Sequence, residues 1–245
     1  MKVPPSDNGT GIPLPTMKEA LSHSTPEQRN IFSRLYRRGT TEESPEILEV
    51  LAQQDLETMA GPSATSDLLD AIAIFHYNSV DMGEDGEYGS GVFASYSRIN
   101  HSCAPNVQNS YNPTSEKLTV HATRQIDKGE EILTSYVNLH RTYEQRKTAL
   151  HVWQVDCECR CCAGPKAAGS KRRRELIFDV DQKLAAYTRN IRARVLGISV
   201  PKNAQEALDV AKRLLQLLRD EGLAGMNLAG VYVSMDCFVV FSWKN

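Results

Sequence analysis

The sequence predicts an α+β protein in which helical segments flank a central stretch of short strands. The strand signal is clearest at 117–123, where apolar residues alternate with polar ones. The helical signal is clearest at 204–218, where apolar residues recur every three or four positions. A third observation is a group of four cysteines within 157–162, because clustered thiols in a chain of this kind indicate a metal site.

Bulk composition sets limits on the class of protein. The chain has 245 residues, 41% of them hydrophobic and 24% charged, which is typical of a globular protein with a sizeable core. A net charge of −2 gives no general attraction to nucleic acid, and the basic run at 171–174 is interpreted as a solvated face or a localisation signal. No secretory signal is found, and the apolar stretch at 231–243 is too short to cross a bilayer. We therefore expect an intracellular protein of the nucleus or cytoplasm, with no membrane partner and no direct binding to nucleic acid.

The N-terminal third is expected to be helical after an irregular start. Residues 1–24 are rich in proline and glycine and show neither period, so they are interpreted as a flexible arm. Thr25, Pro26 and Glu27 form a helix start, with a capping hydroxyl, a proline in the first turn and an early acid. A similar signal follows at 44–46. Helices are predicted at about 26–37, 45–59 and 66–75.

Strands and then helices are expected in the rest of the chain. Turn signals at 112–113 and 127–129 separate the strands, and a helical pattern returns at about residue 140. Gly222 is expected to end the last clear helix, after which an apolar segment can begin another. Strands are predicted at 89–94, 106–111, 117–123 and 131–136, and a helical hairpin is predicted from 176–195 and 204–218.

The cysteine spacing favours a zinc site. Cys157, Cys159 and Cys162 supply three thiolates within six residues, whereas a closed tetrahedral zinc site needs four ligands. Cys103, in the stretch "SRINHSCAPN", is the best candidate for the fourth. Unpaired cysteines in a loop, or a redox cluster, are the alternatives, but the spacing disfavours them. Zinc would then link two segments that are far apart in the sequence.

Three motifs together resemble a known family. "NHSCAPN", "GEEILTSY" and "CECRCC" are similar to the C-terminal half of SET-domain protein lysine methyltransferases that carry a post-SET zinc site. The helix-rich context resembles the branch of the SET-and-MYND proteins and their fungal relatives. The resemblance covers about 78–162, roughly a third of the chain. It implies a partial β-rich SET-type fold of short strands, divided into a helical insert at 25–76, core motifs at 78–139, a post-SET zinc segment at 140–165 and a helical C-terminal region at 166–245.

The resemblance also implies roles for individual residues. By position, Asn78, Asn100 and His101 match residues that hold S-adenosylmethionine, and Tyr136 matches the catalytic tyrosine. Taken singly, these residues have ordinary explanations: Asn100 can cap a turn, and a histidine or tyrosine is more often a core residue. Only their joint spacing supports a site. The zinc ligands implied by the family are Cys103, Cys157, Cys159 and Cys162.

Two departures from the family pattern bear on activity. The glycine-rich first strand of a SET domain is not found, because Gly9 and Gly11 lie in the proline-rich arm and "GSGVFA" at 89–94 runs directly into the "NHSC" motif. The N-terminal part of the SET domain is therefore expected to be missing. Val155 occupies a position where the family often has an aromatic residue, so stacking on the adenine would be lost.

Two functions follow as expectations. The first is an S-adenosylmethionine-dependent protein-lysine N-methyltransferase with structural zinc, truncated and weakly active, whose partner is a protein that presents a lysine side chain. The alternative is a catalytically silent, zinc-stabilised protein-interaction module derived from a SET domain. Calorimetric titration with the cofactor separates the two, since only the first requires binding.

Overall fold

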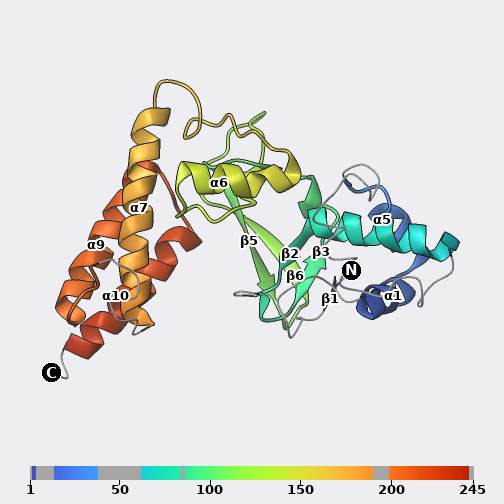
Figure 1. Ribbon diagram of the computed structural model, residues 1–245, viewed down its shortest axis with the longest axis horizontal. Coiled ribbons are helices and arrows are strands. Elements are labelled where there is room, and N and C mark those ends of the chain that lie inside the picture. Colours follow the sequence, from blue (N-terminus) through green and yellow to red (C-terminus); the bar gives the residue numbers. More distant parts are fainter. Residues whose placement is uncertain (1, 4–13, 38–61, 84–85, 190–198, 243–245) are drawn as a thin grey trace. The chain divides into compact units, whose positions relative to one another are not determined.

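The computed structural model describes residues 2–3, 14–37, 62–83, 86–189 and 199–242 (Figure 1). The chain divides into two compact units. The first comprises Met1–Ile99 and Asn109–His121, and the second comprises Asn100–Gln108 and Ala122–Asn245. Each unit therefore contains segments that are distant in the sequence, and the proposed zinc ligands all belong to the second.

The first unit contains the helices α1 (Leu14–Ser22), α2 (Pro26–Phe32) and α5 (Pro62–Asn78). The predicted start of α2 is confirmed: the Thr25 hydroxyl accepts a hydrogen bond from the Gln28 amide, and the Gln28 side chain accepts one from the Thr25 amide. α5 confirms the third predicted helix and extends it at both ends. The predicted helix at 45–59 and the Gly9–Gly11 segment lie outside the described residues.

Helix α1 corrects the interpretation of residues 1–24. These residues were expected to lack any regular period, yet Leu14–Ser22 is helical and the Met17 side chain is fully buried. Proline in the first turn is compatible with a helix because its missing N–H has no intrahelical partner there. The spacing of Leu14, Met17 and Leu21 was the available signal, and the surrounding prolines and glycines obscured it.

The strands of the first unit form a small antiparallel sheet. β1 (Lys2–Val3), β2 (Ser79–Asp81) and β3 (Ser90–Val92) are arranged in the order β1-β3-β2. β5 (Val107–Asn112) and β6 (Lys117–Ala122), most of whose residues belong to this unit, pair as a separate two-stranded sheet; the sequence predicted both strands but not their pairing. Strand β2 was not predicted; it continues directly from α5, where the helical pattern gave no stop signal.

The second unit begins with a short parallel pairing. β4 (Asn100–His101) pairs with β7 (Leu133–Thr134), with Asn100 opposite Leu133 and His101 opposite Thr134. After β7 the chain forms α6 (Tyr143–Leu150), whose first turn is capped by Thr142 in a capping box with Gln145. The "NHSC" segment and the segment before Tyr136 are thus joined by backbone hydrogen bonds.

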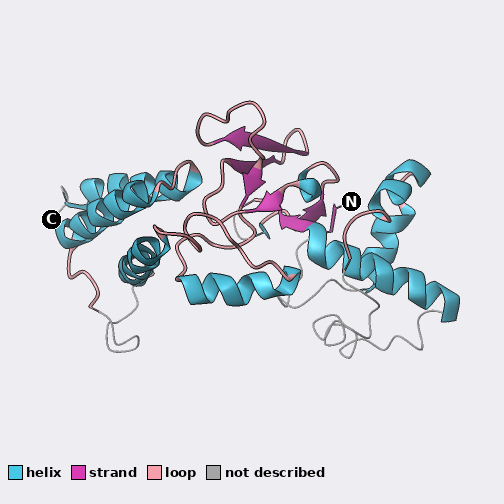
Figure 2. Cartoon of the chain, turned by 90° about the horizontal axis from the view of Figure 1, so that it is seen from above, coloured by secondary structure: helices cyan, strands magenta, loops and turns pink. Residues whose placement is uncertain are grey.

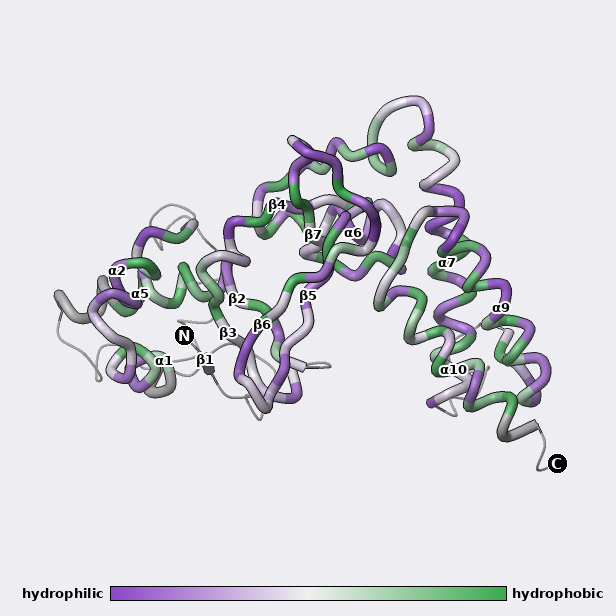
Figure 3. Tube along the Cα trace, turned by 180° about the vertical axis from the view of Figure 1, so that it is seen from behind, coloured by the Kyte–Doolittle hydropathy of each residue, from purple (hydrophilic) through white to green (hydrophobic). Residues whose placement is uncertain are grey.

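Three helices complete the second unit: α7 (Ala167–Thr188), α9 (Ala204–Glu221) and α10 (Met226–Ser242). α9, labelled in Figure 1, packs against both α7 and α10, which are among the helices drawn in cyan near the C-terminus in Figure 2. Its hydrophobic and hydrophilic residues alternate along the tube in Figure 3. Gly222 ends α9 with φ 76°, as predicted, because this left-handed conformation favours glycine. No helix among the described residues has the length and apolar character needed to cross a membrane.

One hydrophobic core connects the helices of the second unit with the cysteine-bearing segments. Ile177 on α7 and Leu218 on α9 are fully buried, and the same cluster includes Cys103 and Leu150. Cys157, Cys159 and Cys162 pack against its edge. The helical C-terminal region is therefore continuous in packing with the segments that carry the candidate site.

Candidate functional site

The second unit brings the four predicted cysteines together. The Sγ atoms of Cys103, Cys157, Cys159 and Cys162 all lie within 4.8 Å of one another. A tetrahedral zinc ion with Zn–S bonds of 2.3 Å separates its sulfurs by about 3.8 Å. The donor set is therefore compatible with a closed zinc site.

The four thiols shift one another's pKa values because their sulfur atoms lie close together. Hydrogen bonds with Cys157 and Cys159 raise the pKa of the Cys103 thiol, and a hydrogen bond with Cys103 raises the pKa of Cys162. Hydrogen bonding by Cys103 lowers the pKa of Cys157 to about 4 and also lowers the pKa of Cys159. Without a metal the sulfurs compete for protons, whereas a divalent cation stabilises all four as thiolates.

Local backbone structure shapes the cysteine loop. The amides of Cys162 and Ala163 both donate to the Cys159 carbonyl, at 2.8 and 3.0 Å. This turn folds the chain so that the sulfurs of Cys159 and Cys162 come close, which explains the two-residue spacing between them. Gly164 then adopts φ 81° and directs the chain toward α7.

His101 connects the tyrosine segment to the cysteine cluster. The Tyr136 amide donates to His101 Nδ1 at 3.0 Å, and His101 Nε2 lies 3.4 Å from Cys103 Sγ. Because the amide can only donate, Nδ1 must be the acceptor, and the neutral ring carries its proton on Nε2. His101 therefore donates to the Cys103 sulfur while it holds the backbone at Tyr136.

The Tyr136 ring is half-buried between two other rings. Its centroid lies 5.3 Å from that of His101 and 5.5 Å from that of Trp153, in tilted arrangements. Such packing restricts the ring. Trp153 follows α6 in a 3-10 turn at His151–Trp153. The structure thus contains an aromatic residue beside the predicted catalytic tyrosine, two positions before Val155.

Two asparagines of the "NHSCAPN" motif bind the 130–133 segment. Asn100 is exposed, and its amide donates to Glu131 Oε1 at 2.7 Å. Asn106 is 1% exposed; its amide donates to the Glu131 carbonyl and its oxygen accepts from the Leu133 amide, each at 2.8 Å. Asn106 is therefore a structural clamp that the sequence did not single out, and its position in the motif was the only signal.

Asn78 belongs to the first unit, whereas the other predicted site residues belong to the second. It lies at the end of α5 and is 7% exposed. Its amide nitrogen donates to the carbonyls of Ile74 and Tyr36, both at 2.7 Å. Because both N–H groups are used in packing, only the side-chain oxygen is suited to a polar contact with a cofactor.

Two buried arginines hold Cys103, and sequence reasoning missed both. Arg146 on α6 is 1% exposed, and its Nε donates to Cys103 Sγ at 3.2 Å. Arg174 on α7 is fully buried, and its Nη2 donates to the Cys103 carbonyl at 2.8 Å. The interpretation of 171–174 as a solvated face is thus wrong for Arg174. Its spacing from the buried Ile177 on the same helix was the available signal.

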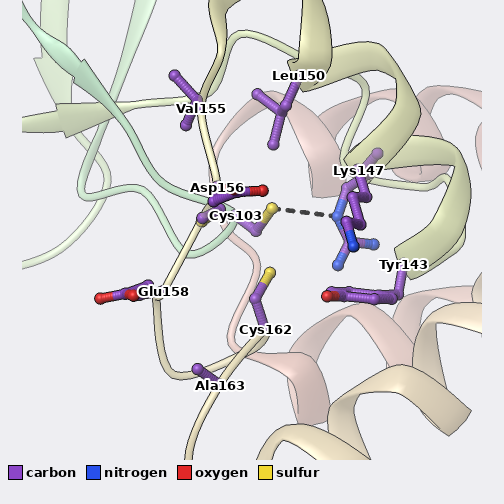
Figure 4. A pocket seen from close by; sticks show the side chains of 11 residues that line it. Cys103, Tyr143, Lys147, Leu150, Val155, Asp156, Glu158, Cys162 and Ala163 are labelled. Atoms are coloured by element: carbon purple, nitrogen blue, oxygen red, sulfur yellow. Dashed lines mark hydrogen bonds between the residues drawn. The ribbon is translucent and has the colours of Figure 1, made fainter.

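A cavity of about 220 Å³ adjoins the cysteine cluster. Figure 4 shows the sulfurs of Cys103 and Cys162 facing α6 across it, with the Tyr143 ring nearby. The dashed line in that view marks the hydrogen bond to Cys103 from α6. Leu150 and Val155 add an apolar part to the wall.

Comparison with known proteins identifies the family to which this chain is similar. Residues 16–137 match the family model of the SET domain. The chain is 31% identical over 193 residues to the histone-lysine N-methyltransferase set5 of Schizosaccharomyces pombe, covering 78% of the chain and 50% of that relative. It is 35% identical over 177 residues to the N-lysine methyltransferase SMYD2 of Gallus gallus, covering 68% of the chain and 40% of that relative. The chain spans about half or less of the length of these curated relatives.

The chain therefore belongs to the SET-domain proteins. Its similarity is in particular to lysine methyltransferases of the set5 and SMYD types, which confirms the resemblance inferred from the three motifs. The family match begins at residue 16, so it includes α2, α5 and β2 as well as the motif region.

Proposed function

We propose that this chain forms part of an S-adenosylmethionine-dependent protein-lysine N-methyltransferase that contains one structural zinc ion. The observation that carries the proposal is the connection made by His101, whose two ring nitrogens join the Tyr136 backbone to Cys103. A cofactor-binding motif, a candidate catalytic hydroxyl and a metal-ligand cluster are thereby held by one side chain.

The residues of the chain have distinct roles in this proposal. S-adenosylmethionine, when bound, supplies an electrophilic methyl group on a sulfonium centre. Asn78 would contact its polar ends through its amide oxygen, Asn100 through its exposed amide, and His101 through backbone groups, because both ring nitrogens of His101 already have partners. Tyr136 would orient the neutral lysine amine through its hydroxyl, since in-line displacement needs the nitrogen lone pair aligned with the methyl carbon. As the nitrogen–methyl bond forms, the methyl–sulfur bond breaks and its electron pair stays on the departing thioether; the methylated ammonium then gives its proton to solvent.

Zinc has a structural role in this scheme. Cys103, Cys157, Cys159 and Cys162 would occupy all four positions of a tetrahedral ion, which leaves no open site for substrate. The ion would fix Cys103, and through His101 the backbone that carries Tyr136. The four cysteines therefore organise the site without taking part in the reaction.

The substrate and compartment are proposed from the relatives. The named relatives act on lysine in histones or are described more generally as N-lysine methyltransferases. We infer a protein lysine side chain as the methyl acceptor, in the nucleus or the cytoplasm. The net charge of −2 gives a nearly neutral surface overall, so electrostatics alone selects no particular acceptor.

Labelled methyl transfer tests the proposal. Purified chain is incubated with methyl-labelled S-adenosylmethionine and a mixture of histones and other lysine-rich proteins, and cofactor binding is measured separately by calorimetry. Tyr136→Phe should lower transfer by about 10²- to 10³-fold, because one oriented hydroxyl is lost at the transition state. Tyr232→Phe, on the exposed side of α10, is the matched control and should leave the rate unchanged.

Three readouts distinguish the alternatives. Cofactor binding with transfer that depends on Tyr136 supports the enzyme. Absence of both cofactor binding and transfer contradicts it, and favours the zinc-stabilised interaction module. Equal transfer by the wild type and Tyr136→Phe would remove the catalytic role assigned to Tyr136.

A further inference from the structure

Arg146 is a buried cation at the cysteine cluster, and none of the carboxylates in the described part of the chain pairs with it. It lies on α6, is 1% exposed, and no Asp or Glu among the described residues forms an ion pair with it. Nε donates to Cys103 Sγ at 3.2 Å, and Nη1 donates to the Arg141 carbonyl at 2.5 Å. Nη2 is buried and has no hydrogen-bond partner in the described part of the chain. A buried guanidinium in this state requires a compensating negative charge.

The cysteine cluster supplies a charge of the opposite sign. Four thiolates around one Zn²⁺ leave a net charge of about −2 in a partly buried site. Cys103 is fully buried, so water contributes little to stabilising its sulfur. The two unbalanced charges are therefore adjacent: the positive guanidinium of Arg146 on α6 lies against a metal site with a net negative charge.

We propose that Arg146 is the counter-cation of the zinc–thiolate centre. Its charge and N–H groups help to retain the metal and make the ligand sulfurs less reactive toward electrophiles and oxidants. Nε holds Cys103, and the unpartnered Nη2 is the donor for a second thiolate when the metal is bound. Cys157 and Cys162 also line the cavity that Arg146 lines, and the sulfur of Cys162 faces α6 beside that of Cys103 (Figure 4), so Cys162 is the candidate for the second thiolate. The inference rests on the proposed zinc ion and assigns to Arg146 a role that neither the motifs nor the comparisons indicate.

Arginine suits this role better than lysine. Its planar guanidinium presents several N–H donors in a fixed fork, so it can serve two sulfurs and a carbonyl at once. Lysine would supply the charge as a single point, without that geometry. N–H···S hydrogen bonds also withdraw electron density from a thiolate, which makes the sulfur less nucleophilic toward electrophiles and oxidants.

The experiment compares zinc retention in matched variants. Arg146→Met keeps the apolar length but removes charge and donors, Arg146→Lys keeps the charge alone, and Lys147→Met changes the exposed neighbour on the same helix. Each protein is purified with zinc, checked by circular dichroism, and titrated with a chromogenic chelator. We expect Arg146→Met to bind zinc about 10- to 100-fold more weakly, as is typical when a group supporting a metal ligand is lost. Arg146→Lys should fall between, and Lys147→Met should match the wild type.

A second readout separates this role from a general loss of packing. In the Co²⁺-substituted protein, the sulfur-to-cobalt charge-transfer band should shift to lower energy in Arg146→Met, because Cys103 loses a hydrogen bond and becomes more electron-rich. Alkylation of the zinc-bound thiols by N-ethylmaleimide should also be faster. A variant that loses only packing would leave the band position unchanged.

The outcomes are distinct. Wild-type zinc affinity and an unchanged cobalt band in Arg146→Met would overturn the proposal. If Arg146→Met does not fold, Arg146→Lys decides, and zinc retention equal to the wild type in that variant would overturn it. Wild-type protein without zinc would contradict the zinc site itself, which elemental analysis of the purified chain reveals before any variant is made.

Discussion

At the scale of a single residue, the side chain of His101 connects the Tyr136 backbone to the Cys103 sulfur. A lone histidine in a mixed sequence is most often a core residue with satisfied hydrogen bonds. Here the fixed donor at Tyr136 selects the tautomer, and the tautomer determines which atom faces Cys103. The tautomer of His101, and therefore which ring nitrogen donates to Cys103, is determined by the two groups it contacts.

Replacing His101 tests its assignment to the cofactor motif. We expect His101→Ala to weaken binding of S-adenosylmethionine by about fivefold, because the backbone at Tyr136 loses a hydrogen bond worth about 1 kcal/mol and no longer holds its place beside the cofactor motif. One zinc ion per chain should still be present after purification, because all four sulfurs remain, although its affinity falls with the loss of the hydrogen bond from His101 to Cys103. Calorimetry and elemental analysis measure the two effects, with the exposed His151→Ala as control. Loss of zinc with unchanged cofactor affinity would reverse the assignment.

Helices α7 and α9 determine the surroundings of Cys103 at the scale of an element. Arg174 on α7 donates to the Cys103 carbonyl, and its Nε donates to Glu221 at the end of α9 at 3.0 Å. Burial raises the pKa of Glu221, but hydrogen bonds from Ser170 and Arg174 outweigh this effect, so the net pKa lies below its ordinary value. A charged network thus fastens two helices of the C-terminal region to the "NHSC" segment.

Removing the central cation of this network should destabilise the second unit strongly. In Arg174→Met the carbonyls of Cys103 and Leu139 lose buried donors, and Glu221 loses a partner. Breaking a buried pair of this kind typically costs about 3–5 kcal/mol of unfolding free energy. Arg172→Met changes an exposed residue of the same helix and should cost less than about 0.5 kcal/mol. Urea denaturation measures both, and equal midpoints for the two variants would show that the network contributes no net stability.

At the scale of the whole molecule, the two units are stabilised by different means. The first has an apolar core on α5, with Ile72 and Phe75 nearly fully buried. The second joins Asn100–Gln108 to a segment that begins at Ala122, and its cysteines come from both parts. A metal that links these parts would contribute folding free energy to the second unit directly.

Zinc removal should therefore act on one unit more than the other. After chelation, we expect amide hydrogen exchange to accelerate at 100–108 and 133–139 and in the cysteine loop, because the ligands no longer hold these segments together. Exchange in the buried turns of α5, such as 71–75, should change little. Cys159→Ser without chelator should give the same pattern. Uniform acceleration in both units would contradict a metal effect confined to the second.

Much of the local structure could be predicted because it depends on neighbours in the sequence. Thr25 with Pro26 marked the start of α2, Gly222 marked the end of α9, and alternation at 117–123 marked β6. Where local signals conflicted, as at Leu14–Ser22, prediction was wrong, since burial of Met17 outweighed the prolines and glycines around it.

The sequence by itself determined the family, the cysteine ligands that could share one metal, and the residues that could form the cofactor site. Those inferences depended on the spacing of residues within short motifs, which the sequence gives directly. Only the tertiary structure decided the state of Arg146 and Arg174, which lie 43 and 71 positions from Cys103 yet both donate to it. From sequence alone, a charged residue is predicted to be exposed, because charged side chains are rarely buried without a partner. The partner that compensates the buried charge comes from a distant segment, so only the fold shows it.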